Sequence, residues 1–110
     1  MRMTLKEVCN HVGVTRRAIQ GYEKAGLVQA IERNKYGHLL YDESAIEKIR
    51  EIKQYQDFGF SIKEIQVLQE VSKEKYLEML EYRLTLMQLE MRKLRENINK
   101  VEQLIAEKRQ

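Results

Sequence analysis

The sequence predicts a mainly α-helical protein, in which a small head of short helices and one hairpin is followed by a single long helix. Three observations support this prediction. The 110 residues include no proline, so no helix has to be interrupted by one. Helix starts are marked by a hydroxyl residue three positions before a glutamate, at Thr4 and again at Ser61. No glycine follows Gly59, and apolar residues continue at helical spacing to the end.

Two short helices are predicted at the beginning of the chain. The first spans Met3–Val12, with Thr4 and Glu7 forming its capping box, and its apolar residues share one face: Leu5, Val8, Cys9 and Val12. Gly13 suits the left-handed residue that ends a helix. Thr15 caps the second helix, which ends at Gly26 and has an apolar face formed by Ala18, Ile19 and Tyr22. Two helices joined by a tight glycine turn predict a helix-turn-helix.

The helical pattern stops between residues 27 and 41, where a hairpin is predicted. Residues 34–37 are typical of a turn, and short extended arms are expected at 30–33 and 39–41. Such a hairpin beside a helix-turn-helix is a wing. Asp42 is the expected cap of a third helix ending at Gly59, and Ser61 that of a fourth. We expect Phe58 and Phe60, on either side of the glycine, to fill the core where these helices meet.

The last helix is predicted to start after Ser72 and to form a coiled coil. Its apolar residues are spaced alternately by three and four positions over about four heptads: Leu77, Leu80, Leu84, Met87, Met91, Leu94, Ile98, Val101 and Ile105. A stripe of this length needs a partner helix, most simply from a second copy of the chain. The predicted organisation is therefore a winged helix-turn-helix head at 1–70 and a dimerisation helix at 71–110.

A second apolar row lies off this stripe in the first half of the long helix, at Tyr76, Met79, Tyr82, Leu86 and Leu89. We expect it to contact a head, from its own chain or from the partner chain, because most apolar rows are structural. An exposed site for another protein or for a small-molecule effector is the alternative.

The distribution of charge favours a polyanion as the partner of the head. The whole chain carries a net charge of +3, but residues 1–41 contain seven Lys and Arg against three Asp and Glu. Residues 42–70 contain four against seven. A single cysteine, Cys9, excludes an internal disulfide, and no apolar run approaches the length of a membrane span. We expect a soluble protein of the cytoplasm, with no membrane contact.

The start of the second helix is where contact with base edges is expected, because a helix-turn-helix presents these residues in the major groove. Arg16 and Arg17 lie there, and an arginine can donate two hydrogen bonds to one guanine. Gln20, one turn further, can read adenine or contact phosphate. Thr15 can contact phosphate as well as cap the helix. Solvated surface side chains are the competing interpretation.

The wing and Tyr22 supply further candidates for contact with double-stranded DNA. Tyr22 has a ring suited to the core and a hydroxyl able to reach phosphate, with a purely structural role as the alternative. Lys35, Tyr36 and His38 lie in the predicted wing and can reach the DNA backbone or the minor groove, and Arg33 lies beside them. Solvated turn residues without a contact role are the alternative.

Metal, cofactor and enzyme functions are not expected. The soft metal-ligand candidates are Cys9, His11 and His38, and the first two do not share a helix face. Cys9 lies on an apolar face and is expected to be a small core residue. The sequence contains no glycine-rich phosphate loop and no nucleophile motif.

These separate motifs together resemble the MerR family of bacterial regulators. The resemblance rests on segments in the right order: Gly13-Val14-Thr15-Arg16-Arg17, residues 22–28 (Tyr-Glu-Lys-Ala-Gly-Leu-Val), Tyr41-Asp42-Glu43, and residues 57–65, which contain Gly59-Phe60-Ser61. Arg17 matches the family's recognition arginine, and Tyr41 matches a wing-exit tyrosine that contacts phosphate. The chain is similar to a short form that lacks an effector-sensing region after the coiled coil.

The resemblance implies a homodimer joined by an antiparallel coiled coil and bound to an inverted repeat. It further implies that the protein bends or untwists a promoter, where RNA polymerase is the expected further partner. Four positions depart from the family pattern: Gln20 and Gly21 stand where arginine and tyrosine are usual, and His38 and Leu39 stand where tyrosine and arginine are usual.

These departures leave two other hypotheses open. One is a coiled-coil interaction module or antirepressor with impaired DNA binding. The other is an excisionase-like protein that bends DNA at an attachment site.

Overall fold

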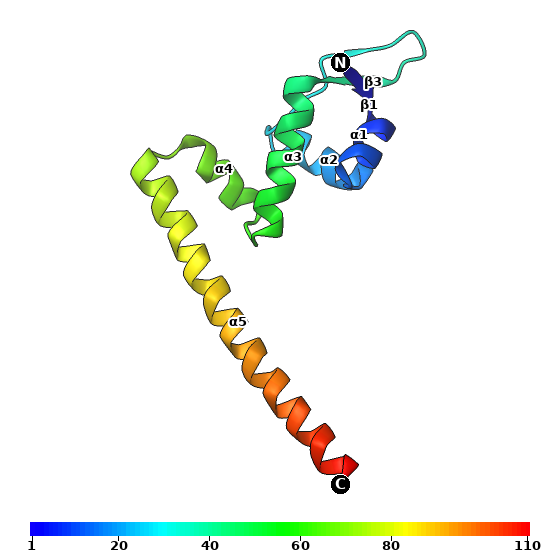
Figure 1. Cartoon of the computed structure of the whole chain (residues 1–110). Coiled ribbons are helices and arrows are strands. Elements are labelled where there is room, and N and C mark those ends of the chain that lie inside the picture. Colours follow the sequence, from blue (N-terminus) through cyan, green and yellow to red (C-terminus); the bar gives the residue numbers. More distant parts are fainter. The chain divides into compact units, whose positions relative to one another are not determined.

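The structure, a computed structural model, describes residues 1–110 and consists of two units, Met1–Glu70 and Val71–Gln110 (Figure 1). The first unit is the head, and the second contains one long helix. The mainly helical fold with a winged helix-turn-helix and a long final helix, which the sequence predicts, is confirmed.

The head contains four helices and a small antiparallel sheet. In chain order its elements are β1 (Arg2–Thr4), α1 (Leu5–Val12), α2 (Arg16–Lys24), β2 (Glu32–Arg33), β3 (Leu39–Asp42), α3 (Glu43–Asp57) and α4 (Ile62–Glu70). Strand β3 is central, with Met3 of β1 opposite Tyr41 on one side and Arg33 of β2 opposite Leu39 on the other. Strand β1 corrects the prediction that Met3 belongs to the first helix, because its backbone pairs with β3 before the helix begins.

Side-chain caps set the starts of the helices as predicted. At α1 the Thr4 hydroxyl accepts the Glu7 N–H at 3.3 Å, and the Glu7 carboxylate accepts the Thr4 N–H at 3.0 Å. This hydrogen bond from the Thr4 backbone lowers the pKa of Glu7. At α2 the Thr15 hydroxyl accepts the Ala18 N–H at 3.0 Å. Each such cap stabilises its helix by about 1 kcal/mol.

The core of the head is built from one apolar face of each helix. Ile19 of α2 and Ile49 and Ile52 of α3 are completely buried, as is Val8 of α1. Burial of each aliphatic side chain contributes roughly 1.5–3 kcal/mol. These contacts fix α2 to the head by one face only and leave the other face of the helix to solvent.

The turn between α3 and α4 corrects the prediction for the two phenylalanines. Gly59 adopts φ 104°, and the Phe60 N–H reaches back to the Tyr55 carbonyl at 3.0 Å. This turn directs Phe60 into the core, edge-to-face with the Tyr55 ring at 6.1 Å, whereas Phe58 is half-buried. Only one of the two phenylalanines therefore fills the core.

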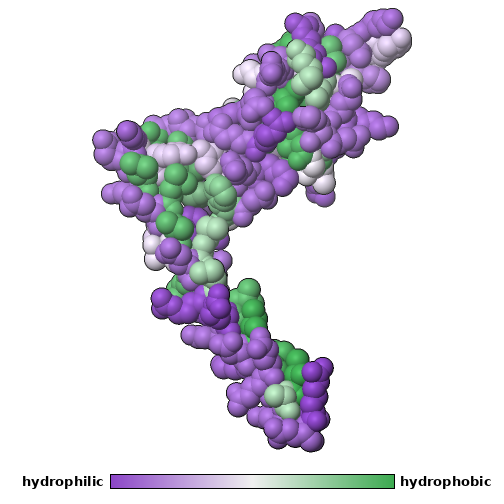
Figure 2. All heavy atoms as spheres, viewed as in Figure 1, coloured by the Kyte–Doolittle hydropathy of each residue, from purple (hydrophilic) through white to green (hydrophobic).

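The second unit is dominated by α5 (Lys73–Arg109), which Ser72 caps by accepting the Lys75 N–H at 3.2 Å. At about 1.5 Å per residue its 37 residues extend for roughly 55 Å. Eight of the nine residues of the predicted stripe are exposed, and Leu80 is half-buried. Figure 2 shows apolar side chains on the surface of this helix near the bottom of the view. No helix in the chain combines the length and the apolar character needed to span a membrane.

Candidate nucleic-acid interface

The exposed face of α2 carries the predicted base-reading residues. Arg16, Arg17 and Gln20 are all exposed, whereas Ile19 and Tyr22 on the other face are buried. The Thr15 cap fixes the first turn from which both arginines project. A helix held by one face and free along the other can enter the major groove without unfolding any part of the head.

The wing is held in shape by its own hydrogen bonds. The Asn34 side-chain oxygen accepts the N–H groups of Tyr36 at 2.9 Å and His38 at 3.0 Å. The Arg33 guanidinium donates to the Gly37 carbonyl at 2.6 Å, and Gly37 takes the left-handed φ of 80° that the turn requires. The wing therefore presents its side chains on a defined backbone.

The tip of the wing carries an exposed aromatic ring with a cation above it. The Tyr36 side chain is 71% exposed, and the Lys35 ammonium lies 5.1 Å from its ring centroid. The His38 ring lies 6.4 Å from the same ring. An exposed ring flanked by cationic and imidazole groups is chemically suited to sugar and phosphate surfaces.

A basic groove lies between the helix-turn-helix and the wing. It is lined by residues of all three strands, α1, α2 and the wing turn: Thr4, Leu5, Lys6, Arg16, Arg33, Gly37, His38 and Leu39. No carboxylate is among them. The groove therefore joins the start of the candidate recognition helix to the wing as one positively charged surface.

Tyr22 and Tyr41, two of the candidates for phosphate contact, are buried in the core of the head, and the structure favours the structural role that was the alternative for Tyr22. Tyr22 is 1% exposed, and its hydroxyl donates to the side-chain oxygen of Gln56 at 2.6 Å. Tyr41 is also 1% exposed, and its hydroxyl donates to the Glu23 carboxylate. Burial raises the pKa of both phenols, and the bond to Glu23 raises that of Tyr41 further. Both residues join α2 to the rest of the head.

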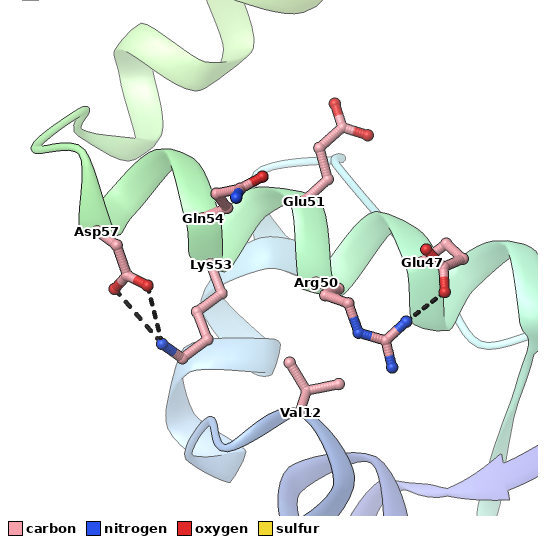
Figure 3. Close-up of a pocket in the computed structure, with 7 residues that line it drawn as sticks. All are labelled: Val12, Glu47, Arg50, Glu51, Lys53, Gln54 and Asp57. Atoms are coloured by element: carbon pink, nitrogen blue, oxygen red, sulfur yellow. Dashed lines mark hydrogen bonds and ion pairs between the residues drawn. The ribbon is translucent and has the colours of Figure 1, made fainter. Parts of the chain in front are cut away.

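A second groove in the head, on α3 and the end of α1, has a different electrostatic character (Figure 3). Both cations of this groove are already paired with carboxylates. Arg50 pairs with Glu47, and the Nζ atom of Lys53 lies 3.1 Å from the Oδ2 atom of Asp57. Glu51 adds a further carboxylate to the lining. This face has no excess of positive charge to offer a polyanion. No group of three or more His, Cys, Asp or Glu side chains is arranged to hold a metal ion.

Two lysines complete the basic surface and were not predicted as contact residues. Lys6 lines the groove, and Lys24 is exposed four residues after Gln20, on the same side of α2. Lys6 lies in the first turn of α1 beside Glu7, and no signal in the sequence singles it out as a contact residue.

The helix-turn-helix, the wing and the basic surface that joins them define a winged helix-turn-helix head of the kind that binds DNA. The sequence profile described as "MerR HTH family regulatory protein" matches residues 3–71. This chain belongs to the MerR family of helix-turn-helix regulatory proteins, a family of regulators rather than enzymes.

Individual relatives agree with this assignment over different lengths. The HTH-type transcriptional regulator YfmP of Bacillus subtilis (strain 168) is 32% identical over 111 residues, covering 96% of this chain and 79% of that protein. Nodulation protein NolA of Bradyrhizobium sp. (strain NC92) is 38% identical over 64 residues, or 58% of this chain. The match covers only 27% of that relative.

Two solved structures share the fold. A MerR family transcriptional regulator from Bacillus cereus matches with a TM-score of 0.76 at 21% identity. The match covers 94% of this chain and 79% of the chain of that regulator. HiNmlR, described as a MerR family regulator lacking the sensor domain and bound to promoter DNA, has a TM-score of 0.70 at 18% identity. That match covers 90% of this chain and 80% of HiNmlR.

Proposed function

We propose that this protein is a sequence-specific DNA-binding transcriptional regulator that acts as a homodimer on an inverted repeat in a promoter. The observation that carries the proposal is the exposed face of α2, where Arg16, Arg17 and Gln20 project from a helix whose opposite face is buried. The adjoining wing adds cations on the same head.

Base reading is assigned to the first turns of α2. Arg17, and beside it Arg16, can each donate two hydrogen bonds to the O6 and N7 atoms of a guanine, which discriminates against other bases by about 1–3 kcal/mol. Gln20 can read the N6 and N7 edge of an adenine one turn further along the helix. The exposure of all three side chains supports this role.

Phosphate contacts are assigned to the cap of α2 and to the wing. Thr15, Arg33, Lys35, Tyr36 and His38 are all exposed and polar, and the wing's internal hydrogen bonds hold the last four on one hairpin. Such contacts position the head on the duplex without reading its sequence. The buried Tyr22 and Tyr41 are assigned to packing instead.

Dimerisation is assigned to the exposed apolar stripe of α5, whose nine residues were predicted as a coiled-coil seam. Leu84, Met91 and Leu94 are each more than half exposed in the single chain, at 53%, 60% and 61%. A second α5 packed antiparallel against this stripe would remove that apolar surface from water. The two heads would then read the two halves of an inverted repeat.

Regulation is assigned to distortion of the promoter. Two heads fixed to one coiled coil hold their recognition helices at a set separation, so DNA with a different half-site spacing must bend or untwist to engage both. That change would alter how RNA polymerase meets the promoter. The description of HiNmlR as bound to promoter DNA supports a promoter as the target.

The test is selection from a random pool of duplexes, followed by sequencing of the retained DNA. Wild-type protein is expected to enrich an inverted repeat with half-sites one or two helical turns apart. Arg17→Ala should retain DNA without enriching the same bases, whereas Arg92→Ala, which removes an exposed arginine from α5 off the apolar stripe, should enrich them normally. A folded wild-type protein that enriches no sequence would refute the proposal.

A further inference from the structure

One residue in the middle of α2 has no side chain, although nothing in the head requires a glycine there. Gly21 is not among the glycines with a left-handed φ, and its carbonyl accepts the Ala25 N–H at 3.0 Å in an ordinary helical bond. A Cβ added to Gly21 would lie in open space. Neither the backbone conformation nor the packing of the head therefore explains why this position lacks a side chain.

A glycine inside a helix lowers the stability of the fold. It has more conformational freedom to lose on folding than any other residue, so an alanine that fits the same position is more favourable. An alanine does fit at position 21, because its methyl group would meet nothing in the head. The missing side chain is therefore a disadvantage for the isolated head, and it becomes an advantage only when a group from another molecule occupies the space.

Gly21 lies on the face of α2 that carries the proposed base-reading residues. It follows Arg17 by four positions and precedes Lys24 by three, so the three residues share one side of the helix. All three are exposed, whereas Ile19 and Tyr22 on the opposite side are buried. The missing side chain therefore leaves a gap between two long cationic side chains, on the face that would lie in the major groove.

The gap suits an apolar group of the size of a methyl. Glycine differs from alanine by one methyl group, and the neighbouring side chains of Arg17 and Lys24 have apolar alkyl stems. The gap offers no free acceptor from Gly21, because its carbonyl is already bonded to the Ala25 N–H. Among the base edges in the major groove, thymine alone presents a methyl group, at its C5 atom.

We propose that Gly21 is a specificity-determining residue, which selects a thymine by leaving room for its C5 methyl group against the backbone of α2. The inference rests on the proposed DNA-binding function and adds a base preference at a position that no side chain reads. One turn of helix advances about 5.4 Å and stacked bases are about 3.4 Å apart. The thymine should therefore lie within about two base pairs of the guanine that Arg17 reads.

The test removes the methyl group from the DNA without changing its base pairing. In a duplex selected by the wild-type protein, each thymine near the guanine contacts is replaced in turn by uracil in one half-site, and affinity is measured by fluorescence anisotropy. Wild-type affinity should fall about fourfold at one of these positions, the effect of burying one methyl group. Gly21→Ala places a methyl group on the protein instead. At the same position it should bind uracil more tightly than thymine, because two methyl groups cannot share the gap.

Gln54→Ala is the matched control, because Gln54 is exposed on α3 and outside the recognition helix, and it should keep the wild-type preference for thymine. Circular dichroism should show that Gly21→Ala is folded with a raised Tm, so that its changed preference does not come from unfolding. A selected site where no uracil replacement weakens wild-type binding would overturn the proposal while the DNA-binding function stood. An undiminished preference of Gly21→Ala for thymine would do the same. A folded wild-type protein that enriches no sequence would overturn both.

Discussion

Tyr22→Phe separates a core role of this tyrosine from a role on the DNA. The substitution removes one hydroxyl, which donates to Gln56 at 2.6 Å and joins α2 to α3. An intramolecular hydrogen bond contributes about 0.5–1.5 kcal/mol net. Gln56 is exposed, so water can satisfy its freed oxygen, and we expect a loss in the lower part of that range, about 0.5–1 kcal/mol.

The assay is thermal unfolding followed by circular dichroism, at one protein concentration because a dimer's stability depends on concentration. A loss of that size should lower the Tm by roughly 2–6 °C. At a temperature where both proteins are folded, DNA affinity should be unchanged, because the ring stays buried and the recognition face of α2 is not altered.

A double-mutant cycle with Gln56→Met identifies the partner of the hydroxyl. If the bond to Gln56 is the source of the effect, the second substitution should cost little more once the hydroxyl is absent. An unchanged Tm together with a loss of DNA affinity of about tenfold, or about 1.4 kcal/mol, would refute the core assignment and place the hydroxyl on a phosphate.

Three further substitutions test other parts of the account. Gly21→Ala should stabilise the head by about 0.5–1 kcal/mol, because Gly21 lies in the interior of α2 with open space where a Cβ would be added; a lower Tm would contradict this. Met91→Glu should abolish both the dimer and tight DNA binding, whereas a dimer retained in sedimentation would show that the heptad register is wrong. Lys35→Ala should weaken binding to all duplexes alike and flatten its salt dependence, and a loss confined to one sequence would assign it to base reading.

Local signals were sufficient to predict most helix starts. Four helices start at the hydroxyl residue that was expected to cap them: Thr4, Thr15, Ser61 and Ser72. Each hydroxyl accepts a hydrogen bond from the backbone N–H three residues later, so the signal is local. The strand β1 was missed, because only three residues form it and its partner β3 lies almost forty residues away in the chain.

The ring of Tyr22 was expected on the apolar face of its helix, but the partners of the tyrosine hydroxyls could not be predicted, for a similar reason. Tyr22 and Tyr41 turn inward because Gln56 and Glu23 accept their hydroxyls, and those partners are 34 and 18 residues away. A tyrosine in or near a recognition helix has the same local sequence whether its hydroxyl meets a core acceptor or a phosphate. The basic groove likewise exists only after folding, since Lys6 and His38 have no local relation to each other.

The central claim is that two copies of the chain read one inverted repeat, and the mass of the protein–DNA complex tests it most directly. Light scattering on the selected duplex should show two chains of 13.2 kDa bound to each DNA molecule, and a duplex with one half-site scrambled should lose most of the affinity. One chain per duplex, with equal affinity for the intact and the half-scrambled site, would contradict the account.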